Sequence, residues 1–311
     1  MHKIYIVGGA NIDIQGVSLK ELNLYDSNIG KVTYSFGGVG RNIAENLQRL
    51  RNNVALVTVF ADDGFGQQLQ SDCRSLGIDI SLSMHDPRAG SSVYLAVLDN
   101  NHDMLVGIAD MDILQSLNHS HLEKVLALID REDLMVIDTN LDKEAIHYLL
   151  TTAGCPIFVD PISTAKSLKI SDELKYITML KPNRLEAESL CGFPIVNQTT
   201  AYQALDYFLS HGVKEIVITL GKDGILASDG QNYGWYHQPE ITVVSATGAG
   251  DAFLAGYIDG WQMGLSMDER LKRACVIAQM TLSSNDTVSK KLTTESLAEA
   301  AENFILSKET L

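Results

Sequence analysis

Residues 246–253 read ATGAGDAF and lead into an apolar pattern of helical period. Gly248 and Gly250, separated by one residue, let the backbone turn tightly, and the helix that follows presents unpaired N–H groups at its positive end. Together with Ala249 they predict an anion-binding turn. Asp251 falls in the first helical turn, where a carboxylate beside a phosphate can accept a proton from an attacking hydroxyl. The alternative is a plain strand-to-helix turn that Asp251 caps.

Two further polar clusters lie at the ends of predicted elements, one before a helix and one after a strand. Residues 35–42 read SFGGVGRN and open a helical pattern; Gly38 allows a ligand to approach the backbone, and Asn42 offers a donor and an acceptor to hydroxyl groups. Asn11 and Asp13 come just after the first apolar strand. Ligands of an open parallel sheet lie at the carboxyl ends of its strands, so we expect these groups to share one crevice. Each cluster alone is equally explained by turn chemistry, but together they suit a polyol.

The rest of the chain alternates between strand and helix patterns. Short apolar runs predict buried strands at residues 4–7, 54–59, 134–137, 157–159, 177–180 and 216–220. Helical patterns lie between most of them, at residues 40–50, 66–76, 142–151, 184–191 and 200–211. This alternation implies parallel strands with right-handed crossovers, and therefore a layered α/β sheet. After Gly264 the chain reads as helices to its end, including residues 267–282 and 294–306.

Two regions break this rhythm, residues 15–35 and 91–110. Inserted strands early in an α/β chain predict a small β-lid over the ends of the parallel sheet. We interpret them as part of one domain spanning residues 1–311, not as a second domain. Because exposed strand edges tend to be covered, we expect the lid strands to pair across a homodimer.

Composition excludes several classes of partner. A net charge of −15 argues against nucleic acid, which is bound through clustered Lys and Arg, although a helix N-terminus with Mg²⁺ can still hold ATP. The four cysteines have no C-x-x-C spacing, which favours reduced thiols over a zinc or redox site. The first residues run directly into a strand, and no stretch approaches the roughly 18 apolar residues of a membrane helix. We expect a cytoplasmic protein that binds neither nucleic acid nor membrane.

Motifs in a consistent order resemble those of the ribokinase-like carbohydrate kinases, also called the PfkB family. Besides the glycine segments, they are residues 181–187 (KPNRLEA) and 219–224 (TLGKDG), and the resemblance runs from about Lys3 to about Leu306. It implies a ribokinase-like three-layer α/β sandwich with a mainly parallel central sheet and a small β-lid. It also implies phosphate transfer from ATP to an alcohol. Residues 8–13, 37–47 and 159–166 (VDPISTAK) resemble more narrowly the pseudouridine kinases, whose acceptor is the 5′-hydroxyl of the nucleoside.

The resemblance assigns roles to the nucleotide side of the site. Asp251 is the general base, and the N–H groups around Gly248, Ala249 and Gly250 hold the charge that develops on the transferred phosphoryl. Asn183 and Glu186 match an N-x-x-E motif that organises Mg²⁺ through its waters. The residues expected to bind ATP are Asn183, Thr219, Gly221 and Gly224.

On the acceptor side, the resemblance points to residues that bind sugar hydroxyls: Asn11, Asp13, Gly38 and Asn42. Asn140, at a strand end, is a further candidate. Tyr94, on a lid strand, borders the base or simply packs. Arg41 either meets phosphate or caps a helix face, and Lys166 is a cation without an assigned role.

The sequence departs from the commoner family pattern at two places. Ser245 replaces an Asp near a monovalent-cation site, and residues 275–279 differ where relatives contact adenine, so potassium activation and the adenine contacts stay open. Two alternatives also stay open: a kinase of ribose, adenosine or a ketohexose, and a non-catalytic sensor on the same fold. The intact base and glycines argue against the sensor.

Overall fold

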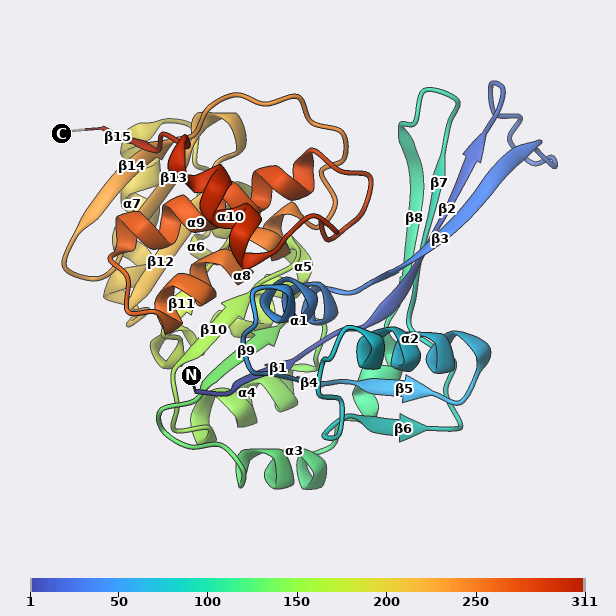
Figure 1. The fold of residues 1–311 in the computed structure, drawn as a ribbon, viewed down its shortest axis with the longest axis horizontal. Helices are drawn as coiled ribbons and strands as arrows, with labels where there is room; N and C mark the ends of the chain where they lie inside the picture. Colours follow the sequence, from blue (N-terminus) through green and yellow to red (C-terminus); the bar gives the residue numbers. More distant parts are fainter. Residues whose placement is uncertain (1, 310–311) are drawn as a thin grey trace.

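A nine-stranded sheet forms the centre of the computed structural model, which describes residues 2–309 (Figure 1). In sheet order the strands are β15 (Ser307–Lys308), β14 (Tyr233–His237), β13 (Ile225–Ser228), β12 (Glu215–Thr219), β11 (Met179–Leu180), β10 (Ile157–Asp160), β9 (Leu134–Asp138), β1 (Ile4–Val7) and β4 (Val54–Val57). The strands from β12 to β4 pair in parallel, and β13, β14 and β15 are antiparallel. The sheet is therefore mostly parallel, as predicted.

Helices cover both faces of this sheet. One layer shares a hydrophobic cluster and contains α1 (Val39–Arg49), α2 (Gly64–Ser75), α8 (Ala249–Gln262), α9 (Met267–Leu282) and α10 (Thr294–Glu302). The opposite layer contains α3 (His119–Leu126), α4 (Lys143–Thr152), α6 (Arg184–Cys191) and α7 (Gln198–Ser210). Shorter helices are α5 (Thr164–Ser167), η1 (Asp112–Ser116), η2 (Leu168–Ile170), η3 (Leu174–Tyr176) and η4 (Gly221–Asp223).

Strand β9 explains why these apolar runs form a buried sheet. Leu134 and Val136 face the cluster under α1 and α8, whereas Met135 and Ile137 face the cluster under α4 and α7. All four are fully buried because successive side chains of a strand point to opposite faces. Strands buried on both faces read as continuous apolar runs, and the predicted three-layer α/β fold is confirmed.

A second, four-stranded sheet projects from one side of the molecule (Figure 1). Its order is β3 (Gly30–Gly37), β2 (Asn11–Ser18), β7 (Val93–Leu98) and β8 (Met104–Asp110). Its central pair, β2 and β7, is parallel, and both outer pairs are antiparallel. A separate parallel pair joins β5 (Val59–Ala61) to β6 (Met84–Asp86).

The structure corrects several predicted elements. The run 54–59 divides at Thr58, whose carbonyl accepts a hydrogen bond from Met84, so the chain leaves the large sheet there. The prediction of helix to the chain end is wrong: α10 stops at Glu302, and β15 pairs with β14, whose edge offers free backbone groups. The hairpin of β13 and β14 was not predicted. Within the described residues, no helix has both the length and the apolarity that a bilayer span requires.

Candidate active site

Asp251 lies in the first turn of α8, and its side chain is buried. Gly248 caps this helix at φ 81°, a conformation that favours glycine, and a side chain there would collide with the carbonyl of Thr287. Among the hydrogen bonds of residues 2–309, none involves the N–H of Gly250 or Asp251, and the N–H of Ala249 makes only a long bond of 3.4 Å. These amides can therefore receive an anion.

Asn42 connects the second glycine segment to this helix. It lies in the first turn of α1, and its Nδ2 donates a hydrogen bond of 2.9 Å to Oδ2 of Asp251. Gly38 precedes α1 at φ 96°, and a side chain there would collide with the backbone of Gly9. Two segments about two hundred positions apart thus meet at one hydrogen bond.

The surroundings of Asp251 change its acidity. Burial raises the pKa of Asp251 to about 8, and the negative charges of Asp160 and Asp138 act in the same direction. The hydrogen bond from Asn42 and the positive charge of Lys181 lower the pKa and offset part of this effect. A carboxyl group whose pKa is near neutrality is suited to general-base catalysis.

Lys181, to which the sequence assigned no role, is a buried cation beside the α8 N-terminus. Its Nζ lies 3.1 Å from Oδ2 of Asp160, and an ideal Cβ on Gly250 would lie 3.5 Å from the same nitrogen. Burial lowers the pKa of Lys181, but the carboxylates of Asp160 and Glu186 outweigh burial and raise it. The ammonium therefore stays charged, and its position at the carboxyl end of β11 is a signal that could have identified it.

Asp138 at the end of β9 is a second residue that the sequence reasoning missed. Its Oδ2 accepts hydrogen bonds from the N–H of Gly9 at 2.7 Å and of Gly40 at 3.0 Å, and its Oδ1 accepts one from the N–H of Asn140 at 2.9 Å. Burial raises the pKa of Asp138. Asn140 in turn accepts a hydrogen bond of 2.5 Å from Lys166 Nζ. This carboxylate ties the start of α1 to the strand end that carries Asn140.

Asn11 and Asp13 lie on β2, where the projecting sheet leaves the body. Asn11 Nδ2 donates a hydrogen bond of 2.6 Å to Oδ1 of Asp13, and burial raises the pKa of Asp13. Gly37 lies beside them, and a side chain there would force the Asp13 carboxylate to move. Tyr94 lies opposite Asp13 in the β2–β7 register, but its hydroxyl bonds Met104 Sδ at 3.4 Å, a packing contact within the sheet.

Asn183 and Glu186 form a reciprocal cap at the start of α6. The Nδ2 of Asn183 donates to Glu186 Oε1 at 2.7 Å, and the N–H of Glu186 donates to Asn183 Oδ1 at 3.0 Å. Glu186 is buried rather than solvated, and burial with the nearby charge of Asp160 raises its pKa. Buried carboxylates that repel each other, beside an amide oxygen, are a donor set that fits Mg²⁺. In the described part of the chain, no group of three or more His, Cys, Asp or Glu side chains lies close enough together to hold a metal ion.

The predicted nucleotide-binding turn lies directly beside this cap. Thr219 forms an isolated parallel bridge with Asn183, and its N–H donates to Pro182 at 3.0 Å. Gly221 has φ 63° and Gly224 has φ 103°, and a side chain on Gly224 would collide with the strand β14 backbone. The cap and the turn therefore occupy neighbouring ends of β11 and β12.

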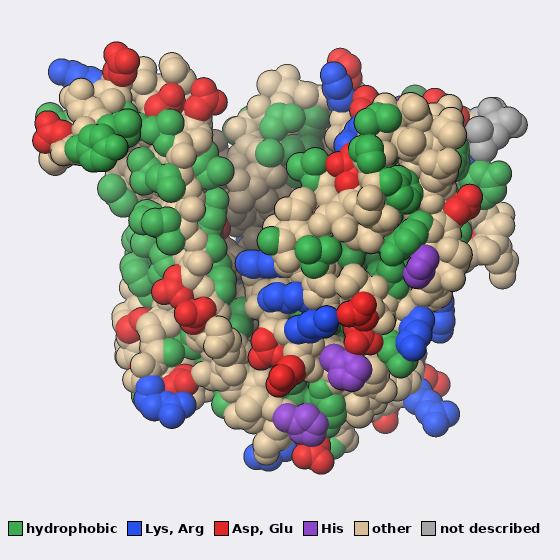
Figure 2. All heavy atoms as spheres, turned by 180° about the vertical axis from the view of Figure 1, so that it is seen from behind, with side chains coloured by type: hydrophobic (Ala, Val, Ile, Leu, Met, Phe, Trp, Pro, Cys, Tyr) green, Lys and Arg blue, Asp and Glu red, His purple; other side chains and the backbone are tan. Residues whose placement is uncertain are grey.

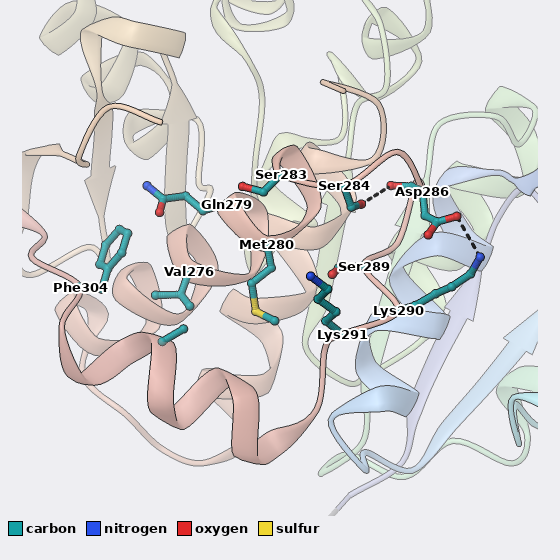
Figure 3. A pocket seen from close by; sticks show the side chains of 11 residues that line it. Val276, Gln279, Met280, Ser283, Ser284, Asp286, Ser289, Lys290, Lys291 and Phe304 are labelled. Carbon is teal, nitrogen blue, oxygen red and sulfur yellow. Dashed lines mark hydrogen bonds and ion pairs between the residues drawn. The ribbon is translucent and has the colours of Figure 1, made fainter. Parts of the chain in front are cut away.

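A pocket of about 480 Å³ opens between α9, α10 and the segment that joins them (Figure 3). Its wall is apolar, with Val276, Met280 and Phe304, and serine hydroxyls and Gln279 supply polar groups. The connecting segment also carries Thr287, which packs against Gly248. The segment that lines this pocket therefore also reaches the α8 N-terminus. Of the lining residues, the sequence had indicated only Val276 and Gln279, within the range 275–279.

Comparison with known proteins places these features in a family. The family model described as pfkB family carbohydrate kinase matches residues 1–294. A pseudouridine kinase of Escherichia coli K12 is 37% identical over 303 residues, which are 96% of each chain. The structure of a carbohydrate kinase from Agrobacterium tumefaciens superposes with a TM-score of 0.82 at 26% identity, covering 98% of each chain.

A likeness in fold extends to more distant structures. Arabidopsis thaliana ribokinase, solved in complex with ribose and ATP, superposes with a TM-score of 0.81 at 19% identity and covers 97% of this chain and 99% of that chain. The match of the family model to most of the chain agrees with the glycine segments, the α6 cap and the layered sheet described above. The chain therefore belongs to the pfkB family of carbohydrate kinases and is an ATP-dependent kinase.

Proposed function

We propose that this kinase transfers the γ-phosphoryl group of ATP to the 5′-hydroxyl of pseudouridine, with Asp251 as the general base. The observation that carries the chemistry is the buried Asp251 carboxylate, held by Asn42 at 2.9 Å beside unpaired amides of the α8 N-terminus. The acceptor is supported by the 37% identity with the pseudouridine kinase of Escherichia coli.

Asp251 takes the proton of the acceptor hydroxyl as that oxygen attacks the γ-phosphorus. The bond from this phosphorus to the bridging oxygen of ATP breaks, and ADP leaves. Phosphoryl transfer depends mainly on positioning and on stabilisation of charge. The amides of Ala249 and Gly250 and the buried ammonium of Lys181 supply that stabilisation from one side. No covalent enzyme intermediate is needed.

On the nucleotide side, we propose that Thr219, Gly221 and Gly224 approach ATP and that Asn183 and Glu186 hold Mg²⁺ through water. The ion supplies positive charge to the phosphates when bound. The apolar pocket in Figure 3 has room for a nucleotide base beside the same helix start, and we assign the adenine to it.

On the acceptor side, Asn11, Asp13, Gly38, Asn42 and Asn140 are the proposed partners of the nucleoside hydroxyls. Asn11 and Asp13 form one hydrogen-bonded pair on β2, and Asp138 joins Asn140 to the start of α1. We assign Tyr94 a packing role in the projecting sheet, because its hydroxyl contacts Met104. A potassium requirement stays a prediction.

The acceptor is tested by phosphorylation of a panel containing pseudouridine, uridine, ribose, adenosine and fructose, with ATP as donor and product mass as the readout. We expect the highest kcat/KM for pseudouridine and a product heavier by one phosphate. Faster turnover of ribose or adenosine would show that the proposed acceptor is wrong but would leave the kinase activity in place. Absence of any phosphorylated product from the panel would contradict both.

We also propose that the projecting sheet pairs with that of a second copy of this chain. One face of this sheet is apolar and exposed: by register Val32 and Ile108, 75% and 58% exposed, share it with Ile14. Figure 2 shows hydrophobic side chains gathered along this projection. Light scattering at micromolar concentration should give a dimer mass, and Ile108→Lys should give a monomer. The control Leu128→Lys, an equally exposed residue elsewhere, should stay dimeric, and a wild-type monomer would refute the pairing.

A further inference from the structure

We propose that Arg41 is a positioning residue that sets the orientation of the Asn42 amide and thereby favours the ionised, proton-accepting form of Asp251. This inference rests on the proposed role of Asp251 as the base. The three side chains form one chain of contacts, from a buried guanidinium through an amide to the carboxylate at the start of α8.

The guanidinium of Arg41 is rigidly anchored on the side away from Asn42. Its Nη2 lies 2.7 Å from both Glu45 Oε2 and Asp72 Oδ2, and its Nε also donates to Asp72 at 3.2 Å. Arg41 is only 3% exposed, and these two carboxylates occupy its Nε and Nη2 donors. A planar group fixed at two edges cannot turn, so the direction of its remaining donor is fixed as well.

That remaining donor determines which way the neighbouring amide points. The Nη1 of Arg41 donates to Asn42 Oδ1 at 3.1 Å and to the carbonyl of Phe36 at 3.4 Å. Arginine has donors and no acceptor, so only the oxygen of the amide can face it. The NH₂ group of Asn42 must then face Asp251, to which it donates at 2.9 Å.

The reversed amide would be unfavourable at both ends. It would place two donor groups against each other at Arg41 and an amide oxygen against the carboxylate of Asp251. With the amide held as observed, Asp251 receives a hydrogen bond that favours its charged form. Because the NH₂ group carries two hydrogens, the second is free to donate to an acceptor oxygen of the substrate.

This hydrogen bond matters because the other groups around Asp251 act on its pKa in opposite directions. Burial with Asp160 of β10 and Asp138 of β9 disfavours the charge, and Lys181, which follows β11, favours it. Glu186 of α6 acts on Lys181. Arg41 itself is faced by Glu45 on α1, Asp72 and Cys73 on α2, and Asp13 on β2.

The competing explanation is that Arg41 has a purely structural role and only holds α1 against α2. Arg49 provides the matched control: it lies on the same helix and bonds the same Glu45, through Oε1 at 2.7 Å, but none of its hydrogen bonds reaches Asn42. A fastening role predicts that both variants lower the melting temperature and leave the acid limb of the pH profile in place.

The test compares Arg41→Lys with Arg49→Lys through the pH dependence of kcat/KM for pseudouridine and through melting temperature. Lysine keeps the positive charge but has no planar fork to reach Asn42 and both carboxylates. We expect the acid limb of Arg41→Lys to move to higher pH by about one unit, a partial loss of a hydrogen bond to a charged group. The limb of Arg49→Lys should overlap the wild type. Overlap of all three limbs would overturn the inference.

Two further variants keep the outcome decisive. If Arg41→Lys does not fold, Asp72→Asn is measured instead, because it removes a carboxylate that anchors the same guanidinium from α2. We expect its acid limb to shift to higher pH by a smaller amount. An unshifted acid limb in Asp72→Asn would then overturn the inference. Asp251→Asn distinguishes failure of the proposed base from failure of the proposed role of Arg41. Wild-type turnover in Asp251→Asn would contradict the assignment of Asp251 as the base. If Asp251→Asn is inactive but the acid limb of Arg41→Lys does not shift, only the role of Arg41 is contradicted.

Discussion

Replacing Asp251 by Asn should inactivate this kinase and at the same time stabilise its fold. The amide has the shape of the carboxyl group and can still accept the hydrogen bond from Asn42, so the site keeps its geometry. It cannot accept the proton of the acceptor hydroxyl, and loss of a general base lowers kcat by about 10²–10⁴-fold. ATP binding should persist, because the α8 amides and Lys181 are unchanged.

The stabilisation follows from the acidity of the buried carboxyl group. Burial raises the pKa of Asp251 from the usual 3.8 to about 8 in the folded protein. Between these values the folded chain holds the proton and the unfolded chain does not, so wild-type stability falls as pH rises. Asparagine does not titrate, so the advantage of the variant should grow with pH by at most about 1.4 kcal/mol per pH unit between pH 5 and 8. Relaxation around Lys181 should reduce the total to about 1–3 kcal/mol.

The assay is denaturant unfolding of wild type and variant at pH 5.5, 7 and 8.5, with turnover measured on the same preparations. Asp206→Asn is the control, because this side chain is exposed on α7 and forms none of the ion pairs or side-chain hydrogen bonds found among residues 2–309; its replacement shows whether loss of any carboxylate gives the trend. Turnover close to wild type, or an advantage of Asp251→Asn that shrinks as the pH rises, would refute the reasoning.

Three other outcomes follow from the same site. The kcat/KM of the wild type should rise through an apparent pKa near 8, because only ionised Asp251 accepts a proton; a profile that is flat from pH 6 to 9 would contradict this. Gly248→Ala should lose most activity and melt at a lower temperature, since its Cβ collides with the Thr287 carbonyl at φ 81°; wild-type kinetics would show that the turn tolerates a side chain. Lys181→Met should lower the free energy of unfolding by about 3–5 kcal/mol, because Asp160 loses its buried partner; unchanged denaturant midpoints would exclude that.

The layered fold and the glycine turns could be predicted from local sequence patterns. The strand at residues 4–7 and the helices at residues 184–191 and 267–282 appear with the predicted bounds, because their apolar periods and caps depend on neighbouring positions alone. β15 and the hairpin of β13 and β14 were missed. The two residues of β15 pair with the edge of β14, and a partner so far along the chain leaves no local pattern.

The same division holds within the site. Gly248, Gly250 and Asp251 could be read from their spacing, because a turn followed by a helix is a local structure. The positions of Lys181 and Asp138 directly after predicted strands could be read as well. Their roles could not, since those arise from charges and amides that other strands bring to the same edge of the sheet. The sequence determined which elements form and which motif carries the proposed base. Only the tertiary structure decided the acidity of Asp251, because burial and the surrounding charges come from segments that meet after folding.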